Sequence, residues 1–155
     1  MGETGGSVRS IQTCPGERLP MRPLEESELR DGGIPGDAHF APGSLRQLLL
    51  IEAETLAELG VETGAVKENI TVEGLTLMGL PAGTRLEVGQ AELEITKECE
   101  PCSRMDEIRD GLKAELVGRR GMMARVTRPG VVRRGDPIRV LQAAPLANGA
   151  APDGG

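Results

Sequence analysis

Aromatic residues are almost missing from this sequence: its 155 residues include one phenylalanine, no tryptophan and no tyrosine. The core must therefore be built from Leu, Val, Ile, Met and Ala, and the stacking platforms of single-strand nucleic-acid binders are absent. Lysine and arginine form no long run and the net charge is −6, which argues against the positive footprint of a nucleic-acid-binding surface. We interpret the acidic excess as a solubility feature.

Long hydrophobic runs and targeting signals are missing too. No apolar stretch approaches the roughly 18 residues of a membrane span, and the first residues lack the basic and then apolar order of a signal peptide. We therefore expect a cytoplasmic protein with no membrane partner. The cysteine count is three, and an odd count in a reducing compartment argues against a disulfide framework.

Length and composition predict one working domain, at residues 7–142. Residues 1–6 are rich in glycine, and residues 143–155 are mainly Ala, Pro and Gly, so we expect a flexible N-terminus and a disordered tail. A domain of this size buries roughly two-thirds of the surface that its unfolded chain exposes, which permits a real core.

Alternating or continuous apolar residues, broken by Gly and Pro, indicate short strands through most of the chain. Strands are expected at 8–13, 45–51, 86–88, 91–95, 122–127 and 137–141, and a helix at 52–59. The clearest hairpin turns at Gly89-Gln90, between two arms of alternating apolar residues. The fold class is therefore mainly β, a closed or nearly closed β-barrel with two or three short helices.

A further helix is expected after the last two cysteines. Ser103 is its predicted N-cap, with Asp106 three residues on, and Gly118 its end. Apolar residues between them follow helical spacing and define one face: Met105, Ile108, Leu112 and Leu116.

The chemistry of the chain centres on Cys99-Glu100-Pro101-Cys102. Cys102 is the favoured working sulfur, because the positive end of a helix dipole would stabilise its thiolate. Three interpretations compete: a redox pair, two buried hydrophobic thiols, and a metal or sulfur site. We favour the last, because the neighbourhood is polar and neither a βαβ setting nor flanking aromatics support a redox pair. A zinc site of Cys14, Cys99, Cys102 and His39 is the weakest alternative.

Three other segments combine glycine with functional side chains. Asp37 and His39 lie in one turn, Lys67 and Asn69 lie at the entry to a strand, and Arg119-Arg120 lies between glycines. The arginine pair suits an anion such as phosphate, since glycine lets the backbone approach and guanidinium groups supply forked donors. Each segment is also typical of an ordinary solvated turn.

In their order along the chain these pieces resemble the MOSC family, named for the C-terminal domain of molybdenum cofactor sulfurase. The resemblance covers residues 8–141, and the matching segments are 36–39, 46–50, 68–70, 74–75, 83–95, 99–102, 118–122 and 135–136. It implies a β-barrel similar to that of pyruvate kinase.

The resemblance also implies the molybdenum cofactor (molybdopterin), a pterin dithiolene that carries a phosphate. Cys102 matches the family cysteine that ligates molybdenum or carries sulfur. The other implied residues are Cys99, His39 and Asp37 in catalysis, and Arg119, Arg120, Lys67, Asn69 and Arg46 in cofactor binding.

From the family we expect reduction of N-hydroxylated compounds, with an external electron donor. The alternative is a carrier that delivers sulfur or cofactor to a molybdoenzyme through a Cys102 persulfide. We expect neither the N-terminal barrel partner of the amidoxime-reducing relatives nor the pyridoxal-phosphate desulfurase domain of the sulfurase. Enclosure of the pterin would then need a homodimer or another protein.

Overall fold

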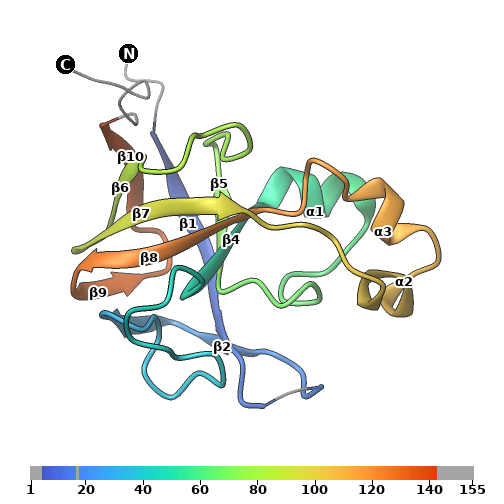
Figure 1. Ribbon diagram of the computed structural model, residues 1–155, viewed down its shortest axis with the longest axis horizontal. Coiled ribbons are helices and arrows are strands. Elements are labelled where there is room, and N and C mark those ends of the chain that lie inside the picture. The colour runs from blue at the N-terminus through green and yellow to red at the C-terminus, as the bar shows by residue number, and fades with distance from the viewer. Residues whose placement is uncertain (1–4, 17, 143–155) are drawn as a thin grey trace.

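Seven strands of the chain close into a β-barrel, with three short helices gathered at one side of it (Figure 1). The computed structural model describes residues 5–16 and 18–142. In chain order its elements are β1 (Gly5–Thr13), β2 (Arg22–Leu24), β3 (Glu26–Leu29), β4 (Leu48–Glu52), α1 (Ala53–Leu59), β5 (Ile70–Glu73), β6 (Arg85–Val88), β7 (Ala91–Glu98), α2 (Arg104–Ile108), α3 (Leu112–Glu115), β8 (Met122–Arg128), β9 (Gly130–Arg133) and β10 (Pro137–Gln142). The mainly β fold predicted from the sequence is confirmed.

The strand order around the barrel is β1-β10-β6-β7-β8-β4-β5, and β5 pairs with β1 to close the ring. Every neighbouring pair is antiparallel except β4 and β5, which α1 connects. β2 extends the sheet beside β1, and β3 pairs with β9 in a separate ribbon. β1 begins at Gly5, two residues before the predicted domain start, whereas residues 1–4 and the predicted tail, 143–155, lie outside the described residues.

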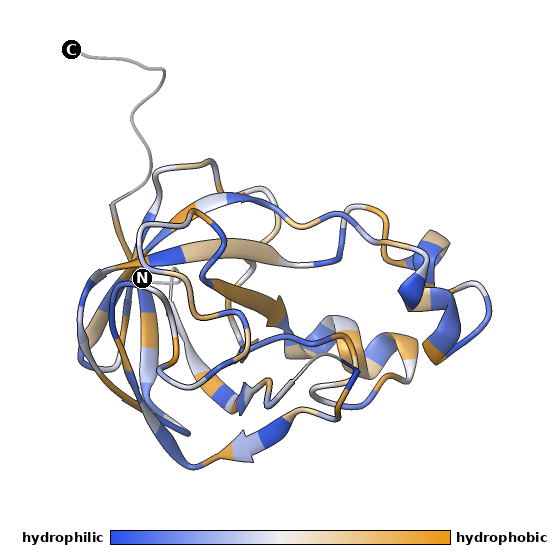
Figure 2. Ribbon diagram, turned by 60° about the horizontal axis from the view of Figure 1, so that its bottom comes forward, coloured by the Kyte–Doolittle hydropathy of each residue, from blue (hydrophilic) through white to orange (hydrophobic). Residues whose placement is uncertain are grey.

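Burial along the strands follows the sequence pattern. On β7 the buried residues Ala91, Leu93 and Ile95 alternate with glutamates that face outward. β4 is instead buried on four successive residues, and Figure 2 shows it as a continuous hydrophobic strand that leads into α1. The predicted hairpin is confirmed, with Val88 opposite Ala91 and Gly89 at a φ of 56°. Gly60, at a φ of 68°, ends α1 as predicted.

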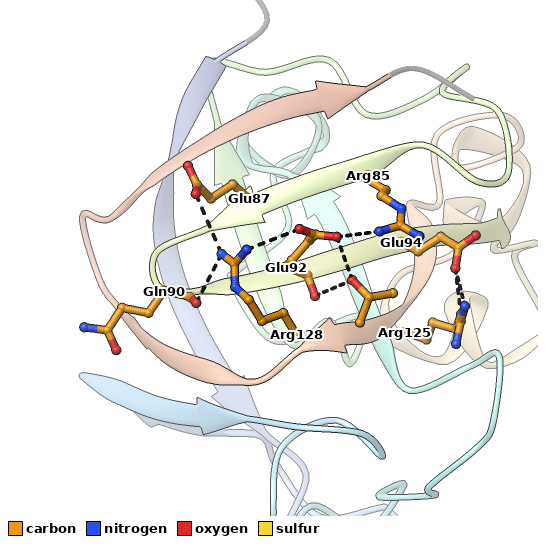
Figure 3. A network of polar contacts seen from close by, with 8 residues as sticks. Arg85, Glu87, Gln90, Glu92, Glu94, Arg125 and Arg128 are labelled. Atoms are coloured by element: carbon orange, nitrogen blue, oxygen red, sulfur yellow. Dashed lines mark hydrogen bonds and ion pairs between the residues drawn. The ribbon is translucent and has the colours of Figure 1, made fainter. Parts of the chain in front are cut away.

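The outer face of β6, β7 and β8 carries a ladder of ion pairs (Figure 3). Glu92 at its centre accepts hydrogen bonds from Arg85 at 2.9 Å and from Arg128 at 3.3 Å, and Arg125 binds Glu94 at 2.7 Å. These cross-strand pairs join neighbouring strands on a polar surface. These ion pairs thus help to hold the barrel wall together.

The single helix predicted after the cysteines is wrong: the structure has two short helices, α2 and α3. Gly111, at a φ of 87°, stands between them, a conformation that glycine adopts without steric cost. Met105, Leu112 and Leu116 are buried as the spacing predicted, but Ile108 is exposed. Ser103 has helical backbone angles and its side chain caps nothing, so the predicted cap is also wrong.

The segment 99–121, which we call the helical arm, leaves the barrel after β7 and returns at β8. Its apolar side chains join α1 and the end of β4 in a small second core, separate from the barrel core: Ile51, Leu56, Val66, Met105, Leu112 and Leu116. Among the described residues no helix is long and apolar enough to cross a membrane.

Candidate functional site

Two adjoining pockets lie where the helical arm meets the barrel, and both are lined by Lys67 and Arg120. The smaller, of about 200 Å³, we call the histidine lobe; besides the shared pair its walls include His39, Arg46, Asn69 and Cys99. The larger, of about 440 Å³, we call the Cys102 lobe; its walls include Cys102, Arg18, Leu19 and Ile108. The structure therefore brings most of the predicted site residues to one cleft.

Arg120 forms the wall between the lobes, and only 6% of it is exposed. One of its nitrogens, Nη2, donates to the carbonyl of Val66 at 2.7 Å. Neither Nε nor Nη1 has a hydrogen-bond partner among the described residues. Buried charged groups are normally paired, so two donor nitrogens of this guanidinium remain unused within the described ranges.

The loop before β5 lies beside Arg120 and contributes Lys67 to both lobes. Lys67 has a φ of 69°, rare for a residue with a side chain, and its Nζ donates to the carbonyl of Leu19. Asn69 is buried and its amide is occupied: Oδ1 accepts from the Leu49 N–H at 3.0 Å, and Nδ2 donates to the carbonyl of Gln12 at 3.2 Å. Asn69 thus fixes the loop to β1 and β4, while Lys67 presents the charge.

Asp37 is the second fixing point of the cleft. Its Oδ2 accepts from the backbone N–H of Cys14 at 2.7 Å and from the hydroxyl of Thr13 at 3.0 Å. Its Oδ1 accepts from the backbone N–H of His39 at 2.8 Å and lies 3.5 Å from His39 Nδ1. The carboxylate is buried and the imidazole is largely exposed, so Asp37 orients His39 at the mouth of the histidine lobe.

The two cysteines of the pair lie in different lobes. Cys99 is buried against Leu49 and Met123 and lines the histidine lobe. Cys102 is exposed and lines the other lobe, one residue before the N-cap of α2. α2 has only five residues, so its dipole is smaller than that of the helix we predicted. Accessibility is therefore what distinguishes Cys102 from Cys99.

The neighbouring arginines 119 and 120 also separate. Arg119 lines neither lobe, and its guanidinium forms an ion pair with Glu58 of α1. Arg46 is exposed at the histidine lobe, as a candidate for binding an anionic ligand should be.

The zinc alternative gains no support, because no three His, Cys, Asp or Glu side chains of the described ranges gather as a metal site. Cys14 is buried, with its Sγ 3.3 Å from the carbonyl of Gly16.

Sequence reasoning missed several residues of the cleft. Arg18, Leu19 and Arg104 reach the Cys102 lobe from segments without a recognisable motif. Glu68, which begins the family-like segment 68–70, was assigned no role, and it is completely buried beneath the loop. Burial raises the pKa of Glu68, opposed by hydrogen bonds from Gly64 and Thr71 and by the charge of Arg120. Lys67 and Asn69 line the cleft and Glu68 lies buried between them, but the left-handed backbone at Lys67 means that no regular alternation in the sequence signalled this arrangement.

Comparison with known proteins agrees with this architecture. Three solved structures share the fold. YuaD from Bacillus subtilis is 22% identical in sequence with a TM-score of 0.75, and the match covers 88% of this chain and 95% of YuaD. YiiM from Geobacillus stearothermophilus is 20% identical with a TM-score of 0.71, over 88% of this chain and 75% of that protein, and YiiM from Escherichia coli is 20% identical with a TM-score of 0.65, over 90% and 71% respectively. Curated proteins give no significant match.

The sequence model of the MOSC domain matches residues 35–139, about two-thirds of the chain. The match includes both lobes of the cleft except for the loop that carries Arg18 and Leu19. With the barrel and the ordered motifs, it establishes that the chain belongs to the MOSC domain family.

Proposed function

We propose that this MOSC domain binds the molybdenum cofactor in the cleft and reduces N-hydroxylated compounds, with Cys102 as a molybdenum ligand. The observation that carries the proposal is that one lobe is lined by both the exposed Cys102 thiol and the buried guanidinium of Arg120, which has two nitrogens without hydrogen-bond partners in the described part of the chain. The molybdenum cofactor presents both a metal that thiolates bind and a phosphate that guanidinium groups bind. The donor set of the cleft therefore fits it.

Each residue has a defined task in this proposal. Arg120 and Lys67 hold the phosphate, and Cys102 supplies the thiolate ligand. Arg46, at the edge of the histidine lobe, adds positive charge for the anionic cofactor. When bound, the cofactor supplies the two-electron redox chemistry, and the protein contributes orientation and electrostatics.

Reduction of an N–OH group to N–H consumes two electrons and two protons and releases water. His39 is suited to deliver protons because its ring nitrogens can both donate and accept a proton, and Asp37 holds its ring at the mouth of the cleft. The electrons must come from an external donor, since no flavin, haem or iron–sulfur motif occurs in the sequence.

The test is to produce the protein in a host that makes the cofactor and to measure bound molybdenum and pterin. Wild type is expected to retain both, and Cys102→Ala to lose most of the molybdenum. Cys99→Ala is the matched control and is expected to retain more, because Cys99 is buried in the other lobe. Retention unchanged in Cys102→Ala would exclude the ligand role. A hydroxylamine-reduction assay with an artificial donor then tests turnover.

A second candidate function is a carrier that delivers sulfur or cofactor to a molybdoenzyme. The exposure of Cys102 favours it, because a persulfide at an open site is reachable by both a sulfur donor and an acceptor protein. This function predicts labile sulfur on Cys102 and no hydroxylamine reduction. Mass spectrometry of the isolated protein, before and after treatment with a reductant, detects that sulfur directly.

A further inference from the structure

Two buried groups of opposite charge lie at the cleft, Arg120 in its wall and Glu68 behind it, and each is incompletely hydrogen-bonded. Glu68 Oε2 accepts from the Gly64 N–H at 2.7 Å and from the Thr71 hydroxyl at 2.9 Å, whereas its Oε1 has no partner. Arg120 lacks partners on Nε and Nη1. No salt bridge within the described ranges joins the two side chains, so they interact only through space.

The balance between these groups decides the protonation of Glu68. Desolvation raises the pKa of Glu68, and the positive charge of Arg120 acts against that rise. An anion bound to Arg120 supplies a second negative charge, which weakens the stabilisation of the Glu68 carboxylate. Bound anion and ionised Glu68 therefore compete for the same cation.

We propose that Glu68 takes up a proton from solvent when an anion occupies the Arg120 site, so that anion binding in this cleft is coupled to protonation. The proton goes to Oε1, which has no donor in the structure. Gln12 Oε1 is an acceptor that also lacks a donor, and both side chains hydrogen-bond to Thr71 Oγ1. A protonated Glu68 would supply a donor in a buried region where these two acceptors have none among the residues that the structure describes. The inference rests on the proposed function in one respect, that an anion, there the cofactor phosphate, binds at Arg120.

Other ionisable groups around the cleft must be separated from Glu68. Gln12 of β1 and Thr71 of β5, which contact it, are uncharged, and Arg120 approaches from the end of the helical arm. The remaining ionisable groups face the two lobes instead: Lys67, His39, Arg46 and Cys99, and then Arg18, Cys102, Arg104 and Glu107. His39 carries the imidazole of this group, and its contribution is separated from that of Glu68 with a His39→Gln variant.

Sulfate is the probe, because it does not change its own protonation from about pH 5 to about pH 9, where the titration is followed. Calorimetry in buffers of different ionisation enthalpy gives the number of protons taken up. In wild type we expect uptake within a pH window and an affinity that falls up to about tenfold per pH unit there. Glu68→Gln is expected to bind sulfate without this uptake, and His39→Gln to keep it.

The location of the anion site is tested with Arg120→Gln, which is expected to abolish sulfate binding. The control is Arg125→Gln, which removes the same charge from the outer wall of the barrel, where Arg125 binds Glu94. Thermal unfolding checks that each variant is folded, and the wild-type proton count needs no variant. The proposal is overturned if the wild-type protein binds no sulfate or takes up no proton on binding it. It is also overturned if Glu68→Gln keeps the proton uptake or if only His39→Gln loses it. Sulfate binding that survives Arg120→Gln would contradict the assigned site. Failure of cofactor binding alone leaves the sulfate result intact, so the two proposals fail separately.

Discussion

The two lobes of the cleft share two cations but are built differently. The histidine lobe is walled by the barrel: Asn69 and Asp37 use nearly all their polar atoms to tie β1, β4 and the preceding loops together. The Cys102 lobe is walled by the loop before β2 and by the five-residue helix α2. The histidine lobe is therefore built against the closed sheet. The Cys102 lobe, which we call the added lobe, is formed by segments outside the sheet.

This difference assigns different capacities to the lobes. A wall made of paired strands and buried hydrogen bonds holds a ligand in fixed geometry, whereas short helices and loops open at lower cost in free energy. Leu19 and Ile108 are exposed large apolar side chains, and both lie in the added lobe. The barrel-walled lobe therefore keeps its lining in fixed positions, and the added lobe can open to admit a ligand to Cys102 and Arg120.

The largest expected effect comes from the second core, on which the helical arm rests. Leu112 is fully buried there, and Leu112→Ala is expected to cost about 2–5 kcal/mol of stability, as deletions in packed cores do. Hydrogen exchange should accelerate mainly in the helical arm and less in β6 and β7. Val117→Ala, at an exposed position of the same arm, is the control and should change stability by less than about 0.5 kcal/mol. Equal acceleration throughout the barrel would show that the two lobes share one cooperative unit.

The second prediction concerns the wall that the lobes share. Arg120→Gln removes a buried donor to a charged ligand, worth about 1.5–3 kcal/mol, so cofactor affinity should fall roughly 10- to 100-fold. Arg119→Gln should cause a smaller loss, because that guanidinium pairs with Glu58 on the surface. Pterin fluorescence after release, normalised to protein, measures both variants. A greater loss from Arg119 would contradict the assignment of the wall.

Local sequence patterns were enough to predict the barrel and the position of the helical arm. The alternation of apolar residues and a glycine turn predicted the β6–β7 hairpin. The continuous apolar run of β4 predicted a strand that is buried on both faces. What failed was the length of the helix after Cys102. Apolar spacing continued across Gly111, but its left-handed backbone splits the helix, and Ile108 turns to the cleft rather than to the core.

The site was predicted by residue type more than by arrangement. The order of the motifs predicted Lys67, Asn69, Arg120 and Cys102 as site residues, and the structure gathers all four at the cleft. Which of two adjacent arginines turns inward could not be predicted, because Gly118 and Gly121 permit either direction. Long-range pairing decides it: Arg120 reaches the carbonyl of Val66, 54 positions away in the chain.

The smallest expected effect concerns an ion pair across the added lobe. Arg18 Nη1 lies 3.2 Å from Glu107 Oε1, so the pair links the loop before β2 to α2 beside Cys102. Both side chains are more than half exposed, which limits the interaction to about 0.2–1 kcal/mol. Glu107→Gln should leave global stability almost unchanged.

The same variant should widen access to Cys102, which is already exposed, since one of the links between the walls of its lobe is lost. Its alkylation rate is expected to rise up to about fivefold, the factor that corresponds to about 1 kcal/mol. Raising the salt concentration should reproduce that rise in wild type but not in Glu107→Gln, because salt screens an exposed pair. Glu25→Gln, which breaks the exposed pair with Arg134 away from both lobes, is the control. An unchanged rate in Glu107→Gln would mean that the added lobe is as fixed as the barrel-walled one, and the comparison between them would then rest on composition alone.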